Sequence, residues 1–291
     1  MVCTGVVRRH LAAYHTIEHI DTLGCMSMGC SALNEFKRGD GVDMDAWGRR
    51  FTFALRYFTR IPIPFKTRLY GDDIARSCSI WPLVGGLESL FVVLMARIGA
   101  MAGYGYAIAA AALLGRMIIG RRKVRAAAHS LDGFGSSRDR VRMVKIMLDK
   151  RYGTIGVLTF LFDFLFKAVF YYEIFENMSF DTGIMILIAS CIAPKLALAA
   201  GATTSRSVFG HDPLIDGSKP KDLWICTLFT AVFFYLVFGW QTAILLVVLE
   251  ISIGLIFSGV IVMRLGGLTK QTLGLIHEVG EIMMLYILLI W

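Results

Sequence analysis

The segment QTAILLVVLEISIGLIFSGVIVM, residues 241–263, indicates the class of fold. It is apolar along almost its whole length, with a single charged side chain among 23 residues. Roughly 20 helical residues are enough to cross a hydrocarbon core about 30 Å thick. Residues 241–263 therefore predict a transmembrane helix.

Similar apolar runs occur on the N-terminal side of this segment and again at the C-terminal end. They cover residues 80–98, 103–120, 155–175, 182–202, 223–238 and 273–291. The whole chain is 56% hydrophobic and only 18% charged, whereas soluble domains have about 25% charged residues. The sequence predicts an all-α, polytopic membrane bundle with about six or seven transmembrane helices and polar cytoplasmic loops.

The formal charge of +8 is concentrated between the apolar runs. Residues 121–152 hold ten Lys or Arg, and basic residues also occur in 49–76, 203–222 and 264–272. Seven spans with a cytoplasmic N-terminus would put all four basic segments in the cytoplasm, as the positive-inside rule requires. We expect a multi-pass protein of the cell (plasma) membrane, the inner membrane where a cell has two. No basic domain with aromatic platforms indicates nucleic-acid binding.

Residues 1–43 form a polar extension without an apolar run. It is either disordered or lies upstream of a true start at Met44, and a metal site of His15, His19, Cys25 and Cys30 is a weaker alternative. The six cysteines of the chain show no CxxC pair, so a disulfide scaffold is not expected.

The basic segment 121–152 also contains the carboxylates Asp132 and Asp149. Mg²⁺ is typically held by one or two carboxylates together with substrate phosphates, so this segment is a candidate phosphate and magnesium site. Within it, residues 136–149 predict a basic helix with Ser136 as N-cap. That helix either lies on the lipid surface or clamps phosphate with its arginines.

The last apolar run contains three ionisable residues, His277, Glu278 and Glu281. Charged side chains inside a membrane span are costly and are functional candidates. The alternative is that the span begins later and these residues lie at the interface.

Four blocks of this sequence resemble adenosylcobinamide-GDP ribazoletransferases, also called cobalamin 5′-phosphate synthases. The blocks are RYFTRIPIP (56–64), WPLVGG (81–86), DGFGSSRDRVRMVKIMLDKRYGTIGV (132–157) and GGLTKQTLGLIHEVGE (266–281), in that order. The resemblance covers residues 44–291 and implies one membrane-embedded domain. It implies a transferase that joins α-ribazole, or its 5′-phosphate, to adenosylcobinamide-GDP and releases GMP, in the last steps of adenosylcobalamin (vitamin B12) biosynthesis.

The resemblance also implies Mg²⁺ as cofactor and a set of site residues. Asp132 and Asp149 are the expected catalytic metal ligands, with Arg60, Arg138, Arg140 and Arg151 on phosphate and Glu278 and Glu281 as supporting carboxylates. Expected partners are the two substrates, the lipid bilayer and other enzymes that handle corrinoids.

The chain departs from the family pattern at several acidic positions. In an ungapped alignment, Arg125 and His129 stand where the pattern has aspartates. A gapped alignment instead places His129 on the family's histidine and Asp132 on its first aspartate, and the set of three aspartates is incomplete in both. Lys145 replaces a glutamate, Gln271 an aspartate and His277 an asparagine. A catalytically degenerate homologue that serves as a membrane scaffold or corrinoid-binding protein is therefore the alternative. A small-solute transporter is a third reading, but no repeat relates the two halves of the chain.

Overall fold

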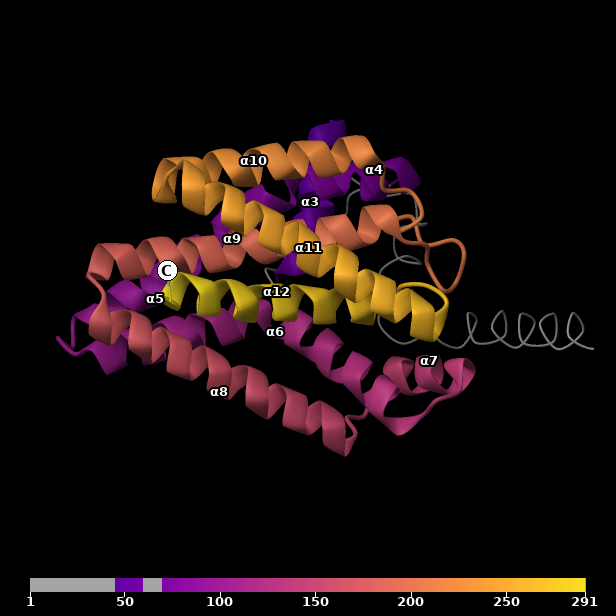
Figure 1. Ribbon diagram of the computed structural model, residues 1–291, viewed down its shortest axis with the longest axis horizontal. Helices are drawn as coiled ribbons and strands as arrows, with labels where there is room; N and C mark the ends of the chain where they lie inside the picture. Colours follow the sequence, from indigo (N-terminus) through magenta and orange to yellow (C-terminus); the bar gives the residue numbers. More distant parts are fainter. Residues whose placement is uncertain (1–44, 60–69, 291) are drawn as a thin grey trace, which may run out of the picture.

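The computed structural model describes residues 45–59 and 70–290, and this part of the chain folds into helices joined by loops (Figure 1). The helices are α3 (Ala46–Phe58), α4 (Gly71–Arg76), the 3₁₀-helix η1 (Ser77–Ile80), α5 (Trp81–Ala100), α6 (Gly105–Ser136), α7 (Arg140–Leu148), α8 (Thr154–Asn177), α9 (Phe180–Thr204), α10 (Pro220–Phe238), α11 (Trp240–Leu265) and α12 (Lys270–Ile290). The predicted all-α class is confirmed. The extension predicted over residues 1–43 lies outside the described residues.

Six helical segments of the described chain are long and apolar enough to cross a membrane. They are Gly71–Ala100, Thr154–Asn177, Phe180–Thr204, Pro220–Phe238, Trp240–Leu265 and Lys270–Ile290. The predicted run at 103–120 falls in α6, which is not among the six; Arg116 interrupts its apolar half and Arg121 follows it. A multi-pass membrane protein is thus confirmed, with six spans by this criterion.

Helix α9 forms the centre of the bundle and is the most completely buried of these spans. It contacts α5, α10, α11 and α12, while α12 also packs on α6, and α6 on α8. The sequence of α9 is rich in alanine. Small side chains let helices pack closely, and in a membrane this van der Waals packing takes the place of the hydrophobic driving force present in water. A Cβ atom at Gly254 of α11 would lie 2.3 Å from the carbonyl oxygen of Ala197, so the two backbones meet there.

The outer helices present large apolar side chains away from the protein. On α8, Phe162 and Phe166 are about half exposed, and on α10, Leu228 and Leu236 are exposed still further. Large apolar side chains exposed in such numbers are unusual on soluble proteins and are expected where lipid covers the surface.

The basic loops gather at one end of the bundle, at the right of Figure 1, where α7, the 205–219 loop and the α11–α12 connection lie together. Ser207 pairs with Leu268 in an isolated bridge, and Lys270 forms an ion pair with Asp212 at 3.2 Å. The helix predicted over 136–149 is confirmed in shorter form as α7, but Ser136 ends α6. The N-cap is Asp139, whose carboxylate accepts the backbone N–H of Arg142.

Candidate active site

Asp132 joins the last turns of α6 to the first turn of α8. Its side chain is almost fully buried, and its two carboxylate oxygens accept the backbone N–H groups of Gly153 at 2.8 Å and Gly156 at 2.6 Å. The first N–H groups of a helix lack partners within the helix and carry partial positive charge. The carboxylate of Asp132 therefore caps α8 and fixes it to α6.

The two glycines of the YGTIG segment are required by this contact. A Cβ atom would lie 2.6 Å from the Asp132 carboxylate at position 153 and 2.1 Å at position 156. Glycine thus allows a close approach of backbone and carboxylate.

The other predicted residues of this segment are more exposed. Asp149 follows the last residue of α7, and its Oδ1 accepts the backbone N–H of Arg151 at 3.2 Å. Arg138 is exposed just before α7, and Arg140 donates from Nη2 to the carbonyl of Met263 at 3.4 Å. Arg60 lies outside the described residues. Chain connectivity keeps Asp149 and Arg151 close to Gly153, which binds Asp132.

His129 and Arg125 lie on the same side of α6 as Asp132 and contact Tyr152. The imidazole of His129 stacks on the Tyr152 ring with a centroid distance of 4.6 Å and an interplanar angle of 14°. The guanidinium of Arg125 lies 5.9 Å from the centre of the same ring. Burial, and next the charge of Arg125, hold the pKa of His129 below its usual value, while Asp132 and Asp149 oppose this shift. The imidazole is therefore neutral near pH 7.

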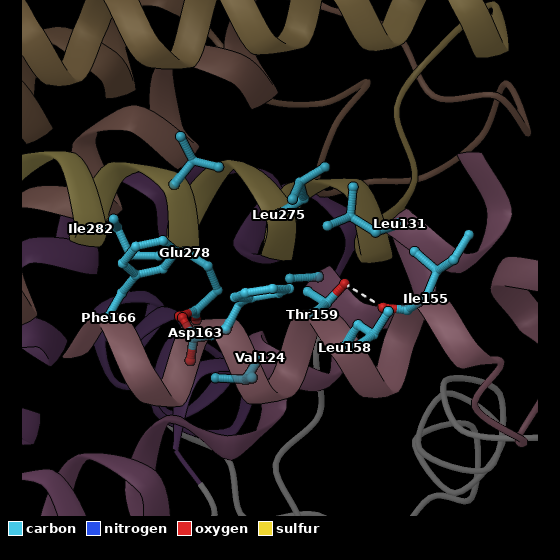
Figure 2. A pocket seen from close by; sticks show the side chains of 13 residues that line it. Val124, Leu131, Ile155, Leu158, Thr159, Asp163, Phe166, Leu275, Glu278 and Ile282 are labelled. Carbon is cyan, nitrogen blue, oxygen red and sulfur yellow. Dashed lines mark hydrogen bonds between the residues drawn. The ribbon is translucent and has the colours of Figure 1, made fainter. Parts of the chain in front are cut away.

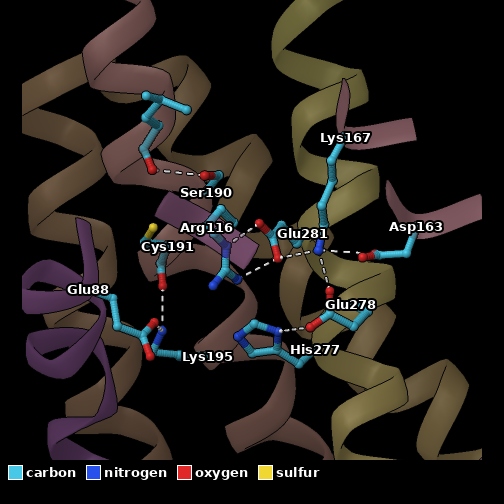
Figure 3. A network of polar contacts seen from close by, with 11 residues as sticks. Glu88, Arg116, Asp163, Lys167, Ser190, Cys191, Lys195, His277, Glu278 and Glu281 are labelled. Carbon is cyan, nitrogen blue, oxygen red and sulfur yellow. Dashed lines mark hydrogen bonds and ion pairs between the residues drawn. The ribbon is translucent and has the colours of Figure 1, made fainter. Parts of the chain in front are cut away.

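Glu278 and Glu281 belong to a separate, fully buried network between α6, α8 and α12 (Figure 3). Arg116 binds Glu281 with two hydrogen bonds of 2.6 and 2.5 Å. Lys167 forms ion pairs with Glu278, with Asp163 at 3.0 Å and with Glu281 at 3.1 Å. The candidate span Lys270–Ile290 begins before these two glutamates, and both are buried inside the helix bundle.

A second part of the network lies on α5 and α9. Lys195 donates to Glu88 at 2.5 Å and to the carbonyl of Cys191 at 2.7 Å. His277 Nδ1 lies 3.3 Å from Glu278. Sequence reasoning missed the cations Arg116, Lys167 and Lys195. The available signal was their position as charged residues within apolar runs, where Arg116 and Lys195 are the single charged residues of 103–120 and 182–202.

The described part of the structure contains two cavities of note, and one of them borders this network. The first, of about 450 Å³, lies between α6, α8 and α12, with apolar walls and the carboxylates of Asp163 and Glu278 on one side (Figure 2). Its Leu131 and Ile155 are the chain neighbours of Asp132 and Gly156. The second, of about 440 Å³, lies at the end of α9 and is lined by hydroxyl side chains, Arg206 and Asp216.

The sequence was compared with known protein families. Residues 50–289, which include nearly all of the described helices, match the family model described as cobalamin-5-phosphate synthase. The chain belongs to this family. The expected family resemblance is thereby confirmed.

Curated relatives match the chain over most of their own length. The adenosylcobinamide-GDP ribazoletransferase of Clostridium novyi (strain NT) is 28% identical over 246 residues, which cover 83% of this chain and 96% of that protein. The protein of the same name from Listeria welshimeri is 27% identical, with 81% and 96% covered. That from Thermoanaerobacter pseudethanolicus is 25% identical, with 80% and 94% covered. No solved structure matches the chain.

Two sets of side chains in the described structure are candidates for binding a metal ion. The ligand atoms of His277, Glu278 and Glu281 lie within 4.8 Å of one another. However, both carboxylates already bind Lys167 or Arg116, and Mg²⁺ prefers oxygen ligands and retained water. This cluster does not fit Mg²⁺.

Asp132 and Asp149 offer carboxylate oxygens, the type of ligand that Mg²⁺ prefers. Each Asp132 oxygen uses one lone pair on a backbone N–H, and Asp149 is exposed with one oxygen bonded to Arg151. Such a pair suits an ion whose other ligands are water and substrate phosphates.

Proposed function

We propose that the chain is a membrane transferase that joins α-ribazole, or its 5′-phosphate, to adenosylcobinamide-GDP and releases GMP. This reaction belongs to the last steps of adenosylcobalamin biosynthesis. The observation that carries the proposal is the family match over residues 50–289, with relatives named for this activity that align over more than nine-tenths of their length.

The reaction balances as a phosphoryl transfer. A ribose hydroxyl of α-ribazole attacks the phosphorus on the corrinoid side of the diphosphate and loses its proton. The phosphorus–oxygen bond to GMP breaks, and GMP leaves with the bonding electron pair. Negative charge develops on the leaving phosphate, so positive groups near it lower the barrier.

The basic end of the bundle supplies groups for this task. Arg138, Arg140 and Arg151 are exposed there, and guanidinium groups bind phosphate oxygens in pairs. Asp132 and Asp149 would hold Mg²⁺ together with the substrate phosphates, and the ion would neutralise charge on the leaving GMP. Asp132 also keeps α6 and α8 together, so it fixes the position of the whole 149–156 segment.

Glu278 and Glu281 act at a distance in this proposal. Their ion pairs with Lys167 and Arg116 hold α12 against α8 and α6, which form the walls of the apolar cavity beside Asp132. We place the basic loops in the cytoplasm and the protein in the cell membrane because Lys and Arg concentrate at one end of the bundle. Other corrinoid-handling enzymes are the proposed protein partners.

The decisive measurement is GMP release by the purified protein in liposomes, with adenosylcobinamide-GDP, α-ribazole phosphate and Mg²⁺. The variants Asp132→Asn and Asp132→Ala separate the two roles of this carboxylate, since Asn keeps one oxygen as acceptor for α8. Release that falls at least about 100-fold in both variants, with a smaller loss of thermal stability in Asp132→Asn than in Asp132→Ala, supports metal binding by Asp132. Activity that falls only in proportion to thermal stability in the two variants would indicate capping alone.

The second candidate function is a degenerate, non-catalytic homologue. It is favoured by Arg125 and His129, which stand beside Asp132 where a metal site would need further carboxylates. A parent that binds adenosylcobinamide-GDP without releasing GMP, and that gains release in the double variant Arg125→Asp/His129→Asp, would support it.

A further inference from the structure

Among the described residues, Arg125 and Lys123 differ from the other cations of the bundle interior because neither forms an ion pair with an acidic side chain. Arg116, Lys167 and Lys195 each form an ion pair with a buried glutamate. Within the described ranges, Arg125 forms no hydrogen bond or ion pair, and its guanidinium lies over the Tyr152 ring. A half-buried guanidinium without a counter-charge is costly, so an anion from outside the protein would stabilise it.

In the described part of the chain, the acidic residues of the surrounding segment bind backbone N–H groups and form no ion pair with Arg125. Residues 121–152 contain ten Lys or Arg but only three Asp. Asp132 binds the N–H groups of Gly153 and Gly156, Asp139 that of Arg142, and Asp149 that of Arg151. The segment therefore has an excess of positive charge around Arg125.

The side chain of Arg125 is held in place by its neighbours. His129 stacks on Tyr152 from the next turn of α6, so the ring under the guanidinium is fixed from the α6 side. Nδ1 of His129 is buried and has no hydrogen-bond partner among the residues that the structure describes, which leaves a polar atom beside Arg125 for a ligand. Lys123, the other cation without an acidic partner in the described ranges, is almost fully buried against Tyr57 and Phe58 and is closed to a ligand.

We propose that Arg125 binds the diphosphate of the substrate directly, on the platform of Tyr152 and His129, so that substrate binding does not require a metal ion. This inference rests on the proposed function. A guanidinium presents two parallel N–H donors to phosphate oxygens and keeps its charge at any physiological pH. Any Mg²⁺ held by Asp132 and Asp149 then contributes to the departure of GMP rather than to capture of the diphosphate.

The test measures binding of two corrinoids to the purified protein in nanodiscs, read from the visible absorbance of the bound fraction. Adenosylcobinamide-GDP carries the diphosphate, and adenosylcobinamide lacks it. In EDTA, the wild type should bind adenosylcobinamide-GDP, and Arg125→Ala should weaken this binding at least about tenfold. Binding of adenosylcobinamide should stay the same. Arg121→Ala, which removes an exposed arginine of the same helix, is the matched control and should change neither value more than about twofold.

Two further variants protect the test against loss of folding. Arg125→Lys keeps the charge without the fork and should retain part of the preference for the diphosphate. Arg125→Asp should bind adenosylcobinamide-GDP only when Mg²⁺ is added. If Arg125→Ala binds adenosylcobinamide-GDP as tightly as the wild type in EDTA, the inference is wrong while the transferase proposal stands. If the wild type neither prefers the diphosphate compound nor releases GMP, the proposed function itself fails.

Discussion

Arg116 of α6 and Glu281 of α12 form a two-pronged ion pair in the interior of the bundle. Nε and Nη2 of Arg116 lie 2.6 and 2.5 Å from the two carboxylate oxygens, and neither side chain is more than 2% exposed. The residues are 165 positions apart in the chain. Removing one member of such a pair leaves an uncompensated buried charge.

Arg116→Leu should therefore lower the free energy of unfolding by about 3 kcal/mol or more. Lys167 contacts the same carboxylate and limits the loss. The double variant Arg116→Leu/Glu281→Leu should recover at least half of it, because no unpaired charge remains. Denaturant titration in detergent micelles, followed by circular dichroism, measures all three proteins.

The exposed ion pair of Lys270 and Asp212 is the control for this comparison. Its N–O distance is 3.2 Å, but the lysine side chain is 43% exposed. Lys270→Ala should change stability by less than about 1 kcal/mol. Equal losses in Lys270→Ala and Arg116→Leu would contradict the role given to burial.

Gly156→Ala tests the contact between α6 and α8. The new methyl group would meet the Asp132 carboxylate at 2.1 Å, and the carbonyl of Ala128 is only 3.2 Å away. We expect a loss of about 2 kcal/mol or more, since overpacking is combined with a weakened helix cap. Gly86→Ala is the matched control, because no atom of the described residues lies within 4 Å of a Cβ atom there. In the interior of α5, alanine should raise stability by up to about 1 kcal/mol. Thermal unfolding of both variants checks the opposite signs.

Periodicity and composition were sufficient to predict the class of fold because a span needs only enough apolar residues in sequence. Six of the seven predicted runs correspond to candidate spans. The basic loops could be grouped for a similar reason, since consecutive spans bring alternate loops to the same end.

The partners of individual charges could not be predicted from the sequence. Glu278 and Glu281 stood out as ionisable residues in an apolar run, yet their cations come from α6 and α8, and tertiary packing alone selects them. Asp132 stood out as a carboxylate in a basic segment. Its bonds to Gly153 and Gly156 depend on how α8 packs against α6, so the sequence could not predict that it caps α8. Its role as a metal ligand stays a prediction.

The partly buried position of His129, which stacks on Tyr152 and feels the charge of Arg125, makes stability depend on pH. Burial and the charge of Arg125 lower the pKa of His129 in the folded protein, whereas the unfolded chain titrates near the ordinary value of about 6.5. Above pH 6.5 both states hold a neutral imidazole. As the pH falls below that value, the unfolded chain binds a proton more readily than the folded one, so the free energy of unfolding decreases.

The pH dependence of stability can be measured by thermal unfolding between pH 7.5 and 5. The midpoint temperature of the wild type should fall over this range, and it should fall less in His129→Gln. Arg125→Ala should also reduce this fall, because the repelling charge is gone. A wild-type slope that persists unchanged in His129→Gln would assign the pH dependence to another group.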